Sequence, residues 1–148
     1  MFFSIFLGFS PLFLSYGYAI VFNINCSTVG KMKKILIASG SETINEALAA
    51  RLQSKYDVYV CIDSHSIIEV LDQVRPDALI INLCLPNITG IEVLRNASYK
   101  PKAIIAFTPI ITNRIICEAH AAGISALIRL PFSIDCIISH LDKLLPSS

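Results

Sequence analysis

The chain has 148 residues, which suffice for one hydrophobic core but not for two ordinary domains. Its 12 Lys and Arg residues nearly balance its 11 Asp and Glu residues, and no basic run stands out, so the sequence does not indicate a nucleic-acid-binding protein. The five cysteines are scattered and include no Cys-x-x-Cys pair. This pattern argues against a disulfide scaffold or a zinc site and favours a reducing compartment.

Residues 1–30 contain no charged side chain, and residues 1–22 are rich in Phe, Leu, Ile and Tyr. About 20 apolar residues can cross a bilayer as a helix, and the lysines that follow by position 34 would then hold the rest of the chain in the cytoplasm. A secretory signal peptide is less favoured, because neither a basic n-region nor a small-x-small cleavage site is present. We prefer a third interpretation, an over-extended start, because Met32 directly precedes the first strand that we assign.

We therefore divide the chain into a hydrophobic N-terminal extension, residues 1–31, and one folded domain, residues 32–146. Within that domain strand and helix patterns alternate about five times. Strands are predicted at 34–38, 58–62, 78–81, 103–107 and 125–130. Helices are predicted from the turn at 39–41 to about 55, and at 65–74, 89–95, 113–122 and 134–144. Such alternation specifies a doubly wound parallel sheet with helices on both faces.

Two helix starts carry the signature of a capping box, a hydroxyl followed three residues later by a glutamate. The first pairs Ser39 with Glu42, and the second pairs Thr89 with Glu92. At the other end of a helix, Gly123 is predicted to be the left-handed residue that ends the segment 113–122.

The stretch from Pro76 to Gly90 carries the most specific pattern. A short apolar run leads to Asn82 at the carboxyl end of a predicted strand, where open α/β sheets place their ligands. This stretch resembles the third strand and following loop of a response-regulator receiver domain, in which a phosphoacceptor Asp is followed by Pro and Gly at intervals of four. The chain keeps Pro86 and Gly90 but has Asn82 in place of the Asp. The resemblance covers nearly all of residues 33–145 and implies a flavodoxin-like five-stranded sheet of order 2-1-3-4-5.

The resemblance also implies where phosphoryl transfer chemistry would lie. The acid pair that holds magnesium in the family maps to Ser39 and Gly40, and its lysine maps to Leu130, directly before Pro131 and Phe132. The hydroxyl at the end of the fourth strand is kept as Thr108. Magnesium is held mainly by carboxylates, so we expect neither phosphorylation nor magnesium binding nor any other cofactor.

Neighbouring residues do not replace the missing groups. Alternation along the strand sends Arg129 to the face opposite Leu130, and Glu42 is disfavoured as a substitute metal ligand. An amide is a poor nucleophile, so Asn82 is predicted to hydrogen-bond instead, with the adjacent loop backbone and Thr108 as candidate partners. No chemistry is assigned to Cys84, on the loop after Asn82.

The resemblance implies a degenerate receiver that acts in the cytoplasm by protein contact or homodimerisation and is not an enzyme. The expected surface is the face of the fourth helix, fifth strand and fifth helix, at 113–122, 125–129 and 133–143, and nucleic acid is not expected as a partner. An alternative is a small-ligand or anion sensor that uses the helix N-terminus at Ser39–Thr43. We prefer an ordinary capped helix start as the explanation of that loop. A membrane contact is expected only if residues 1–22 form an anchor.

Overall fold

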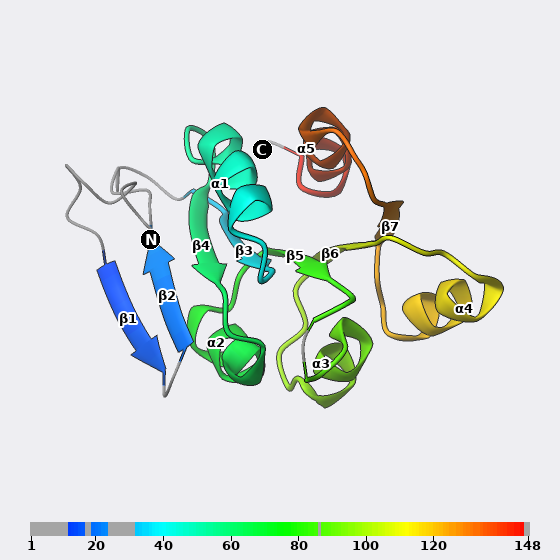
Figure 1. Cartoon of the computed structure of the whole chain (residues 1–148). Helices are drawn as coiled ribbons and strands as arrows, with labels where there is room; N and C mark the ends of the chain where they lie inside the picture. The colour runs from blue at the N-terminus through cyan, green and yellow to red at the C-terminus, as the bar shows by residue number, and fades with distance from the viewer. Residues whose placement is uncertain (1–11, 17–18, 24–31, 86, 147–148) are drawn as a thin grey trace.

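The computed structural model describes residues 12–16, 19–23, 32–85 and 87–146. Its centre is a seven-stranded sheet with the order β1-β2-β4-β3-β5-β6-β7 (Figure 1). The strands are β1 (Leu12–Tyr16), β2 (Ala19–Asn23), β3 (Lys34–Ala38), β4 (Asp57–Cys61), β5 (Ala78–Asn82), β6 (Ala103–Thr108) and β7 (Ala126–Arg129).

The last five strands are all parallel, and their order is the predicted 2-1-3-4-5. β3 lies at the centre, with β4 on one side and β5 on the other. Its residues Ile35–Ala38 are fully buried, as are Ala78–Ile81 of β5. Strands covered on both faces need such continuous apolar runs, which explains why the pattern was readable in the sequence.

The two remaining strands differ from the prediction, which placed no strand before residue 34. β1 and β2 pair antiparallel, and β2 pairs antiparallel with β4, with Phe22 opposite Val60. These segments are rich in aromatic and β-branched residues, which favour strands. The described parts of the segment that was considered as a membrane anchor are therefore strands. Residues 1–11, 17–18 and 24–31 lie outside the described part of the chain. Among the described residues no helix is long and apolar enough to cross a membrane.

Helices cover both faces of the parallel strands (Figure 1). α1 and α5 lie on one face, and α2, α3 and α4 lie on the other, with α4 at the β7 end. The helices are α1 (Glu42–Leu52), the 3-10 helix η2 (Ser64–Ser66), α2 (Ile67–Val74), α3 (Gly90–Asn96), α4 (Asn113–Ala121) and α5 (Ile134–Leu144). The predicted three-layer architecture is therefore confirmed.

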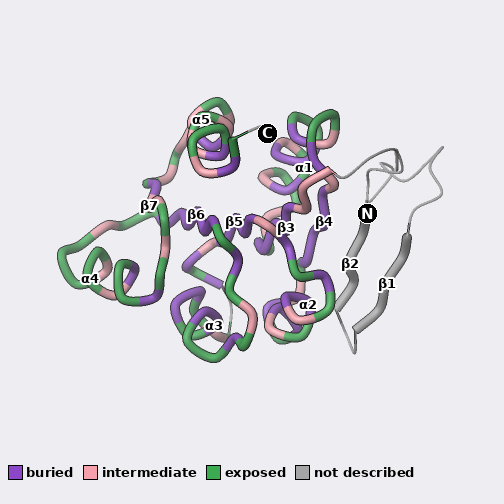
Figure 2. The backbone as a smooth tube through the Cα atoms, turned by 180° about the vertical axis from the view of Figure 1, so that it is seen from behind, coloured by how far each residue is buried: buried purple, intermediate pink, exposed green. Residues whose placement is uncertain are grey.

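The two faces of the sheet give two apolar clusters, and strands β3, β4, β5 and β6 between them are buried along most of their length (Figure 2). The cluster under α1 and α5 contains Ile35, Leu48, Ile80, Phe107 and Leu141. The cluster under α2, α3 and α4 contains Leu36, Leu71, Leu79, Leu94 and Ala119. Neighbouring residues of one strand enter opposite clusters, as the period of two requires.

The start of α1 corrects one prediction. Ser41, not Ser39, caps this helix, because its Oγ accepts a hydrogen bond from the Ile44 amide at 3.3 Å. Ser39 is 1% exposed and its Oγ accepts from the Ser41 amide at 3.0 Å, so the predicted capping box with Glu42 is wrong. The hydroxyl of Ser39 supports the turn that precedes the cap.

The other helix-end predictions are confirmed. Thr89 Oγ1 accepts from the Glu92 amide at 3.1 Å, and Glu92 Oε1 accepts from the Thr89 amide at 3.3 Å, which completes the capping box of α3. Gly123 follows α4 with a φ of 87°, a left-handed conformation that glycine adopts without a steric penalty.

Candidate functional site

The site predicted from the sequence lies at the carboxyl edge of the parallel sheet. Ser39 follows β3, Asn82 ends β5, Thr108 ends β6 and Leu130 follows β7. β3 pairs with β5, β5 with β6, and β6 with β7, all in parallel, so these four strand ends meet at one edge. This is the edge at which doubly wound proteins carry their chemistry.

Asn82 is engaged within its own loop. Its side chain is half-buried, and Oδ1 accepts a hydrogen bond from the Cys84 amide at 2.9 Å. The predicted bond to the loop backbone is confirmed. Thr108, the other candidate partner, makes different contacts: its Oγ1 donates to the Ile110 carbonyl at 3.3 Å and lies 3.6 Å from Cys84 Sγ.

Cys84 is the site residue to which the sequence analysis assigned no role. Its thiol is exposed, yet it contacts Thr108, which is 2% exposed. Residues 83 and 84 form a bend after β5, closed by the hydrogen bond from the Cys84 amide to Asn82 Oδ1, and no spacing in the sequence indicates the resulting contact with Thr108. The hydroxyl that the receiver family keeps free for phosphoryl transfer therefore lies against a thiol here.

The two positions of the family's acid pair hold Ser39, whose hydroxyl accepts a backbone hydrogen bond, and Gly40, which is exposed. The Ser39 carbonyl accepts from Asn45 Nδ2 at 2.9 Å, and its hydroxyl is engaged by Ser41. Gly40 is exposed, and a Cβ built on it would meet no atom within 4 Å. A side chain would thus fit at residue 40, although this sequence places none there.

The helix N-terminus at Ser39–Thr43 was the alternative site for an anion. Two nearby amides are already used, because the Ser41 amide donates to Ser39 Oγ and the Ile44 amide donates to Ser41 Oγ. Fewer free N–H groups therefore remain than an uncapped helix start would offer. The Oδ1 of Asn45, a residue the sequence analysis missed, is a buried acceptor with no hydrogen-bond partner among the described atoms.

The lysine position of the family is apolar. Leu130 is half-buried and packs with the cluster under α1 and α5, and the Leu130–Pro131 peptide bond is cis. Phe132 lies edge-to-face on Phe107, with ring centroids 5.2 Å apart. Arg129 is exposed and does not replace a lysine at this position.

Gly90 shapes the loop that follows Asn82. A Cβ at residue 90 would lie 2.8 Å from Leu83 Cδ2 and 3.0 Å from the Asn82 carbonyl oxygen, so a larger residue would force these neighbours to shift. The Gly90 amide donates to the Leu83 carbonyl at 3.0 Å. The prediction for Pro86 falls on a residue outside the described part of the chain.

The donor set at this edge does not match a magnesium ion. Magnesium prefers several hard oxygen ligands, mostly carboxylates and water. Here Asn82 Oδ1 and Ser39 Oγ both accept backbone hydrogen bonds, and Gly40 has no side chain. In the described part of the chain, no three His, Cys, Asp or Glu side chains come together in a group that could hold a metal.

With this geometry in place, comparison with known proteins identifies the family. The sequence model of the response regulator receiver domain matches residues 35–142. The chain therefore belongs to the response regulator receiver domain family. This agrees with the resemblance found in the sequence and with the observed strand order.

One curated relative and two solved structures show how similar the chain is to known receiver domains and regulators. The chain is 28% identical over 97 residues to the transcriptional regulatory protein TrcR of Mycobacterium tuberculosis, a match that covers 63% of this chain and 37% of that protein's length. The chemotaxis response regulator CheY4 of Vibrio cholerae superposes with a TM-score of 0.69 at 25% identity, over 78% of this chain and all of that one. A CheY-like receiver domain from Methanospirillum hungatei, at 19% identity, gives a TM-score of 0.71 over 76% and 93% of the two chains, which shows the shared fold.

Proposed function

We propose that this receiver domain of two-component signalling is not phosphorylated and acts in the cytoplasm through protein contacts. The observation that carries the proposal is the state of Asn82. It stands at the phosphoacceptor position, and its Oδ1 is occupied by the Cys84 amide at 2.9 Å. An amide that cannot act as a carboxylate nucleophile leaves no route to the usual acyl phosphate.

The surroundings of Asn82 support the same conclusion. Phosphoryl transfer depends on positive charge to stabilise the transferring group. The metal-binding positions hold Ser39 and Gly40, and the lysine position holds Leu130, which packs in an apolar cluster. We expect magnesium to leave the melting temperature unchanged within error, because Ser39, Gly40 and Asn82 place no carboxylates at these positions whose repulsion a cation would relieve.

The face formed by α4, β7 and α5 is the proposed surface for a protein partner or a second copy. Ile116 of α4 is 49% exposed there, and Ile110 in the loop before α4 is 63% exposed. A groove of about 350 Å³ that includes Ile116 is lined mainly by apolar side chains: Ile111, Ile116, Ala119, His120, Ile124 and Leu127. Exposed apolar side chains grouped around a groove are typical of protein contact sites.

The chemical part of the proposal is tested by incubation with acetyl phosphate and magnesium, followed by intact mass measurement. No added phosphate is expected on the wild-type chain. A matched variant that restores all four groups (Asn82→Asp, Ser39→Asp, Gly40→Asp and Leu130→Lys) is expected to gain label, whereas Asn82→Asp alone is not. Phosphate on the wild-type chain would refute the proposal.

The contact surface is tested separately by sedimentation velocity over a range of concentrations. Ile116→Lys is expected to weaken self-association or capture of a partner. Ile62→Lys is the matched control, because Ile62 is 41% exposed and follows β4, far along the sheet from β7. Equal effects of the two variants would remove the α4-β7-α5 face from the proposal.

A further inference from the structure

A second cavity of about 350 Å³ lies between α3 and α4, beside the carboxyl ends of β5 and β6. This volume falls at the lower end of the range of about 300–1,000 Å³ found for small-molecule sites. The cavity is distinct from the apolar groove on the other side of α4 and from the loop at Ser39–Thr43. Its size suits a metabolite-sized molecule.

The body of the cavity is apolar. Leu83 and Ile91 are 6% and 8% exposed, and Ile115 is a half-buried residue of α4. Cys84 and Thr108 add a thiol and a buried hydroxyl where β5 and β6 end. A ligand that fills this space must therefore carry an apolar body to cover the three aliphatic side chains.

Four charged side chains line the cavity, two glutamates and two arginines, and their contacts show which of them a ligand could engage. Glu92 Oε1 accepts from the Thr89 amide, and Arg114 Nε donates to Glu118 Oε2 at 3.3 Å. Arg95 is an exposed residue of the lining, and within the described residues it has no hydrogen-bond or ion-pair partner, so its guanidinium group is free to meet a ligand at the mouth of the cavity. A guanidinium group recognises a carboxylate through two parallel hydrogen bonds.

We propose that the cavity between α3 and α4 binds a small organic monocarboxylate, with the carboxylate on Arg95 and the apolar body against Leu83, Ile91 and Ile115. Inorganic phosphate would leave the aliphatic wall uncovered, and a neutral molecule would leave Arg95 unpaired. The proposal requires nothing of Asn82. Its failure would therefore leave the proposed function standing, and the reverse also holds.

The chain contains its own reporter of occupancy. Cys84 lines the cavity with an exposed thiol, so a bound ligand is expected to slow its alkylation. Cys117 on α4 is also exposed but does not line the cavity, and it serves as an internal reference. The rates of N-ethylmaleimide labelling at both cysteines are followed by peptide mass in the full chain, with benzoate, acetate, benzamide or inorganic phosphate as the probe.

Benzoate is expected to slow Cys84 labelling at least tenfold at saturation and to leave Cys117 unchanged. Acetate, which lacks the apolar body, and benzamide, which lacks the charge, should each need a concentration at least tenfold higher. Arg95→Gln should raise the half-protecting concentration of benzoate by about tenfold or more. The matched control is Arg129→Gln, which removes an exposed arginine of β7 outside the cavity lining and should have no effect.

Three results would overturn the proposal. Equal protection by benzamide and benzoate would show that charge plays no part, and equal protection by phosphate would show a simple anion site. An unchanged benzoate response in Arg95→Gln would show that Arg95 does not bind the carboxylate. If Cys84 labelling does not change at all, isothermal titration of benzoate into the wild-type chain decides, and the absence of binding at millimolar concentration rejects the site.

Discussion

Helices α1 and α5 lie together on one face of the sheet, whereas α4 lies at the β7 end of the other face (Figure 1). Leu48 of α1 and Leu141 of α5 are fully buried in the cluster that they share with the strands. Of the nine residues of α4, only Ala119 is buried. A cavity lies on one side of α4 and a groove on the other, so this helix covers the sheet with much less apolar contact.

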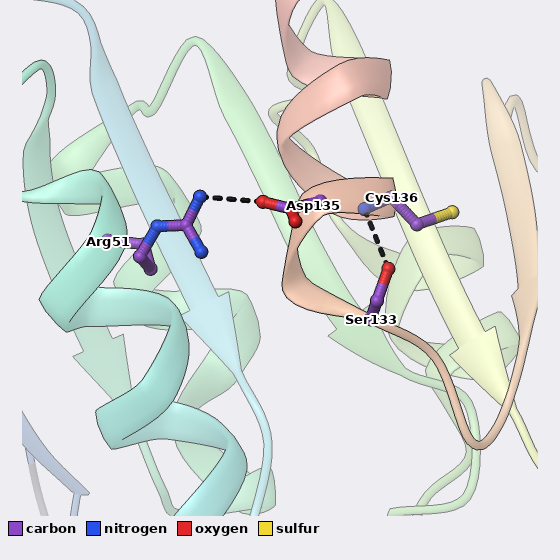
Figure 3. Close-up of polar contacts among 4 residues, drawn as sticks. All are labelled: Arg51, Ser133, Asp135 and Cys136. Atoms are coloured by element: carbon purple, nitrogen blue, oxygen red, sulfur yellow. Dashed lines mark hydrogen bonds and ion pairs between the residues drawn. The ribbon is translucent and has the colours of Figure 1, made fainter.

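Ion pairs also distinguish the two regions, although they contribute little to the difference. Arg51 of α1 contacts Asp135 of α5 at 2.6 Å (Figure 3). Lys55, in the turn after α1, contacts Asp142 of α5 at 3.0 Å. All four side chains are at least half exposed, and pairs of this kind contribute at most about 1 kcal/mol. The comparison teaches that buried aliphatic area, rather than charge, fixes a helix to this sheet.

The largest expected effect separates the two regions directly. Leu48→Ala should lower the free energy of unfolding by about 2–5 kcal/mol, because it removes a fully buried side chain and leaves a cavity. Ile116→Ala on α4 should change it by less than about 1 kcal/mol, because that side chain is 49% exposed. Urea denaturation measures both. Similar losses in the two variants would break the comparison.

On the face that carries α4, the packing under the neighbouring helix α2 is expected to be tight, and Cys61 provides a test. Burial raises the pKa of the Cys61 thiol, in the cluster under α2, to about 12. The folded state then retains a proton that the unfolded state loses above its pKa of 9.0, so stability is complete below pH 9 and falls as pH rises towards 12.

Above pH 9 the free energy of unfolding should decrease less steeply with pH in Cys61→Val than in the wild type, by up to about 1.4 kcal/mol for each pH unit. Stability curves at several pH values measure the slope. At neutral pH, Cys61 should resist alkylation while Cys117 of α4 reacts, because the first is fully buried and the second exposed. Reaction at comparable rates would show that both parts of this face open equally.

A smaller effect is expected from two matched helix caps. Thr112 Oγ1 accepts from the Ile115 amide at 3.2 Å in α4, and Ser133 Oγ accepts from the Cys136 amide at 3.3 Å in α5 (Figure 3). Replacement of either by Ala should cost about 1 kcal/mol. In Thr112→Ala the loss should appear as faster amide exchange confined to α4, since few buried contacts couple that helix to the rest. Exchange that is faster throughout the domain would contradict this.

The smallest effect concerns the ion pair between α1 and α5. A double-mutant cycle of Arg51→Gln and Asp135→Asn should give a coupling energy of about 0.2–1 kcal/mol that decreases with added salt. Thermal and urea unfolding of the four proteins supply the cycle. A coupling well above 1 kcal/mol would show that charge, and not only aliphatic burial, distinguishes the α1–α5 region from α4.

Much of the fold was predictable because its signals are local and periodic. Buried parallel strands appear as unbroken apolar runs, as at residues 78–81 of β5, and the capping box of α3 lies within four residues. Boundaries were less accurate where two hydroxyls compete, as at Ser39 and Ser41, and where a 3-10 turn precedes α2. The hairpin of β1 and β2 was missed because its apolar composition suits a spanning helix and a strand equally.

The site was predictable only as far as it follows the strand ends. Asn82 was found at the carboxyl end of a predicted strand, and Ser39 and Thr108 were found through the resemblance to receiver domains; the parallel strands bring all three to one edge. The contact between Cys84 and Thr108 and the cavity lined by Arg95 depend on how α3 and α4 pack. No sequence spacing encodes such a juxtaposition, because the residues lie on separate elements.

The pair of strands β1 and β2 also changes which strand forms the unpaired edge of the sheet. β4 would otherwise be the outermost strand, but β2 pairs with its residues Tyr59–Cys61. A shortened protein that begins at Met32 would present that row of amides and carbonyls to other molecules, and bare strand edges of this kind recruit further strands. In the full chain the outermost strand on this side is β1, so the hairpin moves the open edge of the sheet from β4 to β1.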